Sequence, residues 1–94
     1  MISADRIVVY KTERCPYCVA AVRFLTEAKG LDIDIVDITG DWAARQALAE
    51  RSGRTSVPQI WIGLTHVGGF DDLRALESAG ELDPLVKNVV SAQG

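Results

Sequence analysis

Two cysteines, Cys15 and Cys18, flank Pro16 and Tyr17 and are the only cysteines in the chain of 94 residues. A helix that begins at Pro16 makes Cys15 its N-cap, because proline fixes φ at about −65° and lacks the N–H group that a first turn leaves unpaired. The rest of that turn directs free N–H groups and the positive end of the helix dipole at the Cys15 sulfur. Such a setting lowers the pKa of a cysteine from ~8.5 to roughly 3.5–7.5. We therefore expect Cys15 to be the nucleophile and Cys18, on the inward face, to be the shielded resolving thiol.

Three other uses of the cysteine pair compete with this interpretation. A structural disulfide would close a loop too short to constrain the unfolded chain much. A zinc site needs about four ligands, and beside the two cysteines the chain offers a single histidine, His66. An inert buried pair is the third alternative. A Cys-x-x-Cys pair beside a βαβ pattern favours redox chemistry instead, and no metal site is predicted.

Length and composition limit the class of protein. The 94 residues, 48% of them hydrophobic, fit a single domain over residues 1–94 with one modest core. No apolar stretch is long enough for a signal peptide or a membrane span. The net charge of −3 and the pI of about 5.0 give no sign of a nucleic-acid partner. We expect a cytoplasmic protein, in a reducing compartment where paired thiols are more often catalytic than structural.

The first half of the chain predicts two strand–helix units. A β-branched run at residues 6–10 predicts a strand buried on both faces, which leads into the loop before Cys15. The helix that follows extends to Gly30, and its periodicity predicts an inward stripe of Cys18, Ala21, Val22, Leu25 and Ala28 and an outer face of Arg23, Thr26, Glu27 and Lys29. A second strand is expected over residues 33–38, and then a helix that is capped by Asp41 and ends near Gly53.

The second half predicts a hairpin and two helices. Residues 59–62 and 65–67 are joined by only Gly63 and Leu64, which favours an antiparallel hairpin with a type II′ turn. Asp71 or Asp72 can cap a third helix, and Asp83-Pro84 opens a last helix whose apolar residues are Leu85, Val86, Val89 and Val90. His66 is expected to be a hairpin residue without a catalytic role, and both tryptophans, Trp42 and Trp61, are expected to pack rather than bind.

The order βαβαββα, with an added C-terminal helix and a reactive cysteine pair after the first strand, is the thioredoxin-like arrangement, an α/β fold with a four-stranded mixed sheet flanked by helices. Three motifs then resemble the short bacterial dithiol glutaredoxins: residues 15–18 (Cys-Pro-Tyr-Cys), 55–59 (Thr-Ser-Val-Pro-Gln) and 68–73 (Gly-Gly-Phe-Asp-Asp-Leu). The resemblance extends from Val8 to about Leu85. It implies a thiol-disulfide oxidoreductase that uses glutathione as co-substrate and holds no cofactor permanently.

The resemblance also implies where glutathione lies. The Val57–Pro58 bond is expected to be cis, which exposes the backbone of Val57 beside Cys15 so that a cysteinyl peptide pairs with it as a short antiparallel strand. Lys11 occupies the family's position for the glycyl carboxylate, and its charge would also favour the Cys15 thiolate. Arg54 lies next to the same segment and is a second cation for the ligand. Arg45 is a weaker candidate for that carboxylate, and Arg14 for tuning the field at the nucleophile.

The other end of the ligand is expected at the third motif. Gly68 and Gly69 allow close backbone approach, and the N–H groups of Phe70 and Asp71 at a helix start would hold the γ-glutamyl carboxylate. Asp72 would accept from the ligand's ammonium, although plain helix capping also explains both aspartates. Tyr17 is expected to be exposed and to form a flat wall beside the sulfur. Several relatives carry an extra cysteine where this chain has Phe70, so regulation through a side disulfide is not expected.

The expected substrates are glutathionylated proteins and protein disulfides, such as that of ribonucleotide reductase, and the expected state is a monomer. Two rival functions remain. One is an electron donor served by thioredoxin reductase, against which the anion contacts of Lys11 and residues 68–72 argue. The other is a dimer that holds a [2Fe-2S] cluster through Cys15 of each chain and two glutathiones, against which Pro16 argues.

Overall fold

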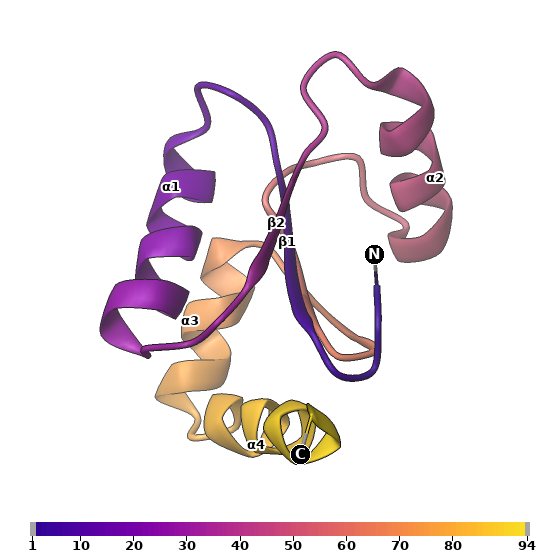
Figure 1. The fold of residues 1–94 in the computed structure, drawn as a ribbon. Helices are drawn as coiled ribbons and strands as arrows, with labels where there is room; N and C mark the ends of the chain where they lie inside the picture. Colours follow the sequence, from indigo (N-terminus) through magenta and orange to yellow (C-terminus); the bar gives the residue numbers. More distant parts are fainter. Residues whose placement is uncertain (1, 94) are drawn as a thin grey trace.

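A computed structural model describes the chain over residues 2–93, with the side chains of residues 2–89 (Figure 1). The elements follow in the predicted order, with one further helical segment directly after the first helix. Their bounds are β1 (Ile7–Lys11), α1 (Pro16–Arg23), η1 (Phe24–Ala28), β2 (Asp34–Asp37), α2 (Trp42–Ser52), β3 (Gln59–Ile62), β4 (Thr65–Gly68), α3 (Phe70–Ser78) and α4 (Leu82–Gln93). Within the described residues, no helix is long and apolar enough to cross a membrane.

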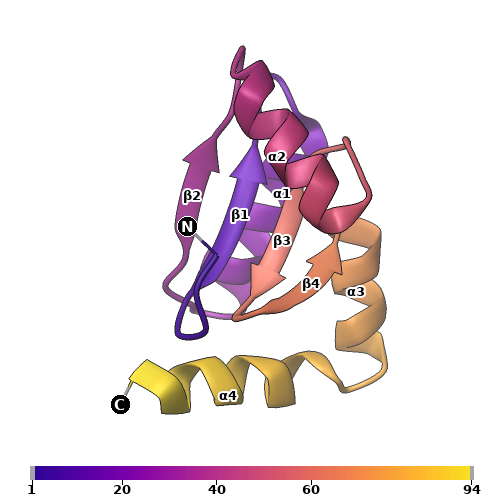
Figure 2. The ribbon, with the colours of Figure 1, turned by 90° about the vertical axis from the view of Figure 1, so that its right-hand side faces the viewer.

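The sheet is mixed and has four strands in the order β2-β1-β3-β4. β1 pairs in parallel with β2, whereas β3 is antiparallel to both β1 and β4. The four strands and the helices around them confirm the predicted thioredoxin-like fold. The parallel pair delivers the ends of β1 and β2 to the same edge of the sheet, where the loop to Cys15 begins (Figure 2).

The central strands are buried on both faces, as expected for β1. α1 and α3 cover one face of the sheet and α2 covers the other, while α4 crosses the end of the sheet that lies away from the β1–α1 loop (Figures 1 and 2). Side chains alternate between two cores. The larger core lies under α1, α3 and α4 and contains Ile7, Val9, Ala21, Leu25, Ile60, Ile62, Leu73, Leu82, Val86 and Val89. The smaller core lies under α2 and contains Val8, Ile38, Leu48 and Trp61.

The inward stripe of the first helix is correct up to Leu25 and wrong beyond it. The chain passes into a π-helical segment, η1, in which the Lys29 N–H donates to the carbonyl of Phe24 at 3.0 Å. This wider turn changes the phase of the helix. Ala28 is therefore exposed, and Lys29 turns inward, where its side chain is only 19% exposed and its Nζ lies 2.8 Å from both Glu77 and Asp83. Lys29 thus joins the end of the first helical segment to α3 and α4.

The predicted caps of α2 are confirmed. Asp41 accepts a hydrogen bond from the Ala44 N–H at 3.0 Å, and Gly53 ends the helix in the left-handed region with φ +77°. The expectation that Trp42 packs is wrong, because its side chain is 70% exposed. Leu48 is the residue of α2 that reaches the smaller core, and Trp42 lies on another face of the helix.

The hairpin and the last two helices follow the prediction with shifted starts. Gly63 has a positive φ of +61°, and the next residue, Leu64, has a negative φ. This order of signs agrees with a type II′ turn. The N-cap of α3 is Gly69 rather than Asp71 or Asp72. α4 begins at Leu82, just before the predicted Asp83-Pro84 start, and the predicted packing of Val90 lies outside the described side chains.

Candidate active site

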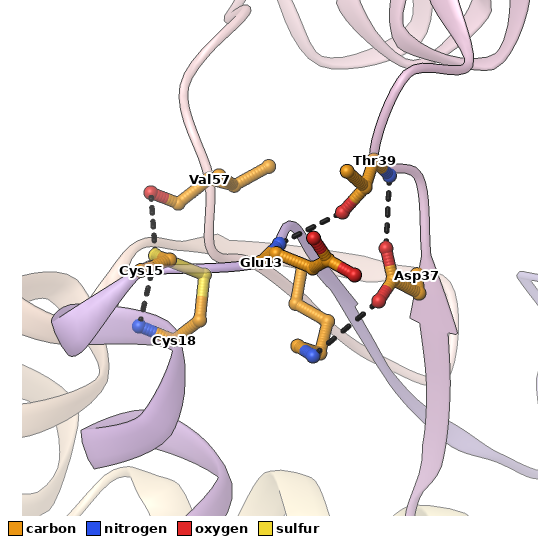
Figure 3. Close-up of a disulfide and its surroundings, with 7 residues drawn as sticks. Glu13, Cys15, Cys18, Asp37, Thr39 and Val57 are labelled. Carbon is orange, nitrogen blue, oxygen red and sulfur yellow. Dashed lines mark hydrogen bonds and ion pairs between the residues drawn. A yellow bond between two sulfur atoms is a disulfide. The ribbon is translucent and has the colours of Figure 1, made fainter.

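Cys15 and Cys18 lie at the N-terminus of α1 and are joined by a disulfide, with Cα atoms 5.1 Å apart (Figure 3). Cys15 is the N-cap, with extended backbone angles, and Pro16 opens the helix as predicted. The Cys18 N–H donates to Sγ of Cys15 at 3.1 Å. Cys18 is fully buried, whereas Cys15 is partly exposed. An approaching substrate therefore meets the sulfur of Cys15 first.

The loop before Cys15 is tied to the end of β2. Its last residue, Arg14, has φ +55°, a left-handed conformation that is uncommon for a residue with a side chain. The Glu13 N–H donates to Oγ1 of Thr39 at 2.8 Å, and the Thr39 N–H donates to Oδ1 of Asp37 at 2.8 Å. Nζ of Lys11 lies 3.5 Å from Oδ2 of the same aspartate. Asp37 at the end of β2 and Thr39 just beyond it thus fix the turn that presents the nucleophile.

The pKa of Asp37 is lowered, mainly by hydrogen bonds from Thr39 and less by the Lys11 ammonium. Asp37 is therefore ionised at neutral pH and holds Lys11 close to the edge of the sheet. Neither Asp37 nor Thr39 was predicted from the sequence to belong to the site. The parallel register of the two strands could have indicated Asp37, because Lys11 and Asp37 are paired residues at the ends of β1 and β2.

A groove of about 220 Å³ lies near the disulfide. Most of the residues predicted to bind the ligand line it, but Lys11, Arg45, Arg54 and Gly68 do not. The lining residues, of which only Ser56 was not predicted, are Tyr17, Ser56, Val57, Pro58, Gly69, Phe70, Asp71 and Asp72. The Val57–Pro58 peptide bond is cis, as the resemblance implies. The carbonyl oxygen of Val57 lies 3.9 Å from Sγ of Cys15, which connects the groove to the sulfur (Figure 3). Tyr17 is 64% exposed, and its ring centroid is 6.5 Å from that of Phe70.

The far end of the groove is the first turn of α3. Asp72 accepts from the Gly69 N–H at 2.9 Å, and the Arg54 guanidinium donates to the same carboxylate oxygen at 2.9 Å. These two contacts, the Gly69 hydrogen bond first, lower the pKa of Asp72. The Leu73 N–H donates to the Gly69 carbonyl, so the N–H groups of the first turn, ahead of Leu73, have no intrahelical acceptor. This end of the groove therefore combines anion-binding N–H groups with a carboxylate.

Because the pKa of Asp72 is lowered, its contribution to stability is present above the ordinary carboxyl pKa and is lost as the pH falls through the lowered value. We expect Asp72→Ala to reduce the free energy of unfolding at pH 7 by about 1 kcal/mol, mostly through the lost Gly69 hydrogen bond. The half-exposed ion pair with Arg54 adds little in water. The difference from wild type should shrink as the pH is lowered to about 3.

Urea unfolding at the two pH values measures this difference. Asp71→Ala is the matched control, because it removes the same charge from the same turn without touching the Gly69 hydrogen bond. An equal loss in the two variants, or a loss that does not change with pH, would contradict the assignment to Asp72.

The two predicted cations outside the groove have protein partners. Lys11 forms an ion pair with Asp37, and Arg54 forms one with Asp72. Arg45 donates from Nε to the carbonyl of Thr55 at 3.0 Å, so it ties α2 to the segment that precedes Val57. His66 packs its ring on that of Trp61, with centroids 4.6 Å apart. Trp61 is buried as expected.

The family model for glutaredoxin matches residues 7–67, which include the cysteine pair and the Val57–Pro58 turn. The chain belongs to the glutaredoxin family. It is 51% identical to a glutaredoxin of Pseudomonas aeruginosa over 80 residues, which cover 85% of this chain and 94% of the relative. It is 48% identical to glutaredoxin 3 of Escherichia coli over 79 residues, covering 84% and 94%.

Solved glutaredoxin structures have the same fold. The solution structure of a glutaredoxin from Brucella melitensis matches with a TM-score of 0.77 and 43% identity, and the match covers 92% of both chains. The crystal structure of a buckwheat glutaredoxin–glutathione complex matches with a TM-score of 0.82 and 25% identity, covering 94% of this chain and 82% of the other. As a glutaredoxin, the chain is a thiol oxidoreductase with a redox-active pair of cysteines.

Proposed function

We propose that this glutaredoxin is a glutathione-dependent oxidoreductase that reduces glutathionylated mixed disulfides and protein disulfides through Cys15 and Cys18. The observation that carries the proposal is the groove near Cys15, which has a backbone edge at Val57 and an anion-binding helix start at Phe70. A cysteinyl tripeptide with a charged group at each end matches these features. The complex of the buckwheat relative with glutathione supports the same ligand.

In this proposal the γ-glutamyl end of glutathione lies at the first turn of α3. The N–H groups of Phe70 and Asp71 donate to its carboxylate, in the way that helix N-termini hold anions. Asp72 accepts from its ammonium, since the lowered pKa keeps this carboxylate charged. Arg54 has two roles, because it orients Asp72 in the free protein and adds positive charge for the incoming carboxylate.

The cysteinyl part of glutathione pairs with the backbone of Val57, which brings its sulfur next to Cys15. Tyr17 provides the flat wall on the exposed side. The glycyl carboxylate then extends toward Lys11, whose ammonium exchanges its half-exposed partner Asp37 for the ligand. The contact of Lys11 with Asp37 keeps the cation at the edge of the sheet until the ligand arrives.

For a glutathionylated substrate, the Cys15 thiolate attacks the glutathione sulfur. One sulfur–sulfur bond forms as another breaks, and the substrate leaves as a thiolate that takes a proton from water. A second glutathione, as thiolate, then attacks the glutathione sulfur bound to Cys15 and leaves as oxidised glutathione. The helix start at Cys15 stabilises the thiolate in both steps, as attacking group first and as leaving group afterwards.

For a protein disulfide, Cys15 attacks one substrate sulfur and Cys18 resolves the mixed disulfide. This produces the Cys15–Cys18 bond seen in the structure, which two glutathiones then reduce. We propose that the protein works as a monomer in the cytoplasm, without a permanently bound cofactor, on disulfides such as that of ribonucleotide reductase.

A coupled assay tests the proposal. A glutathionylated peptide is supplied with glutathione, glutathione reductase and NADPH in one reaction, and with thioredoxin reductase and NADPH in the other. We expect NADPH to be consumed in the first reaction and not in the second. Turnover supported by thioredoxin reductase alone would replace the proposal with that of an electron donor independent of glutathione.

A further inference from the structure

A second hollow lies beside the groove, on the outer surface of α2. It has a volume of about 530 Å³ and is lined by Trp42, Arg45, Gln46, Ala49, Glu50 and Thr55. The five helical residues are spaced so that they share one face of α2. This is not the face that carries Leu48 into the core. Here this hollow is called the Trp42 hollow.

Trp42 is the most exposed of the large apolar side chains in the described part of the chain. Trp42 also lines a smaller hollow of about 210 Å³, together with Ile38, Gly40, Asp41 and Arg45. An exposed indole that lines two hollows has apolar surface free for contact, and tryptophan is among the residues that contribute most to interfaces. None of the functions assigned above uses this residue.

The Trp42 hollow is continuous with the glutathione groove along the chain. Thr55 lines the hollow, and the next two residues, Ser56 and Val57, line the groove. Arg45 holds the two together, because its Nε donates to the Thr55 carbonyl at 3.0 Å. Residues 55–57 therefore lead from the Trp42 hollow to the Val57 carbonyl near the Cys15 sulfur, and this short segment is braced against α2.

The direction of a bound peptide follows from this continuity. A peptide whose cysteine is bonded to Cys15 and runs antiparallel to Val57 places its next residues opposite Ser56 and Thr55. At ~3.3 Å for each extended residue, the side chains roughly two to four residues after the cysteine reach the Trp42 hollow. Residues before the cysteine lead the other way, toward α3. Glutathione ends at the residue after its cysteine and does not extend that far.

We propose that the Trp42 hollow binds an apolar side chain of a protein substrate, located shortly after the cysteine that Cys15 attacks. The inference rests on the proposed antiparallel pairing at Val57, and it adds a specificity element for polypeptide substrates. Trp42 and Ala49 supply the apolar contact, and the polar lining residues Arg45, Gln46, Glu50 and Thr55 include one charge of each sign, so the hollow favours neither charge. The occupant is therefore an aliphatic or aromatic residue rather than a charged one.

The test is a competition between peptides on the Cys18→Ser variant, which holds a peptide on Cys15 as a stable mixed disulfide. The incoming peptide thiolate attacks Sγ of Cys15 and displaces the bound peptide as a thiolate, so one disulfide forms, one breaks, and no oxidant or glutathione is needed. One peptide has leucine as the third residue after its cysteine, and the other has it as the third residue before. We expect the exchange equilibrium to favour the first peptide about five-fold.

Trp42→Ala should bring this ratio to about one. Leu64→Ala is the matched control, because Leu64 is also an exposed apolar residue but lies in the β3–β4 turn, at the far end of the sheet from Cys15; the ratio should stay as in wild type. No preference between the peptides, or a preference that survives Trp42→Ala, would overturn the proposal. If Cys18→Ser fails to fold, Cys18→Ala serves instead.

Sedimentation equilibrium of the wild-type chain and of Trp42→Ala adds a second readout. A monomer in both cases supports the proposal, whereas a wild-type dimer that Trp42→Ala dissociates overturns it, since a second copy would then cover the hollow. Because the competition contains no glutathione, its result is independent of the coupled assay. The failure of one proposal is therefore distinguishable from the failure of the other.

Discussion

Cys15→Ser is expected to abolish both activities of the protein, the release of glutathione from mixed disulfides and the reduction of protein disulfides. A serine hydroxyl remains protonated at neutral pH and forms no disulfide, so neither first step has a nucleophile. We expect turnover to fall by at least about 10³-fold for either class of substrate. Cys15 is partly exposed, whereas Cys18 is fully buried. Cys18 therefore cannot replace Cys15 as the group that attacks the substrate.

Cys18→Ser should separate the two activities. Removal of glutathione needs only Cys15 and free glutathione, so this activity should stay within about ten-fold of wild type. Reduction of a protein disulfide needs Cys18 to release the substrate from Cys15, and it should be lost. The mixed disulfide between Cys15 and the substrate should then accumulate.

Steady-state turnover of a glutathionylated peptide and of a protein disulfide measures the two activities, and mass spectrometry detects the trapped intermediate. The two variants control for each other, since each removes one sulfur from the same disulfide. Residual activity of Cys15→Ser on both substrates would refute the assignment of the nucleophile. Loss of both activities in folded Cys18→Ser would show that the buried thiol also takes part in the first exchange.

The fold follows from local signals that agree with one another. The β-branched run of β1, the Asp41 cap and the Gly53 stop of α2, and the short link at Gly63 each define one element and its boundary. What the sequence did not reveal is the phase of the helix after Leu25. Ala28 and Lys29 both fit an inward position by spacing, and the choice depends on partners 48 and 54 residues away, Glu77 and Asp83.

The candidate site has the same division between local and distant signals. The residues that line the groove come from three short motifs and could be found by reading along the chain. The ionic partners could not, because Lys11 and Asp37 are 26 residues apart and Arg54 and Asp72 are 18 apart. Trp42 was misassigned for a related reason. The sequence indicates that one face of the α2 helix is buried, but only the packing of α2 on the sheet decides which face that is.

Gly68→Ala is expected to damage both stability and the groove. Gly68 has φ +113°, a conformation that residues with a side chain rarely adopt. A Cβ atom there would overlap the Asp72 carboxylate and lie 2.9 Å from the Arg54 guanidinium. Relief of the overlap moves Asp72 away from the Gly69 N–H, which opens the first turn of α3. We expect the free energy of unfolding to fall by about 2–3 kcal/mol.

Gly69→Ala is the matched control, one residue further along the chain. Its φ of −93° suits any residue, and the nearest contacts of an added Cβ are at 3.8 Å, an ordinary van der Waals distance. The loss of stability should be no more than about 1 kcal/mol, the usual cost of alanine at an N-cap. Urea unfolding of the two variants at pH 7 measures the difference. Equal losses would mean that the backbone at Gly68 relaxes without displacing Asp72, and the aspartate would then not depend on this glycine for its place in the groove.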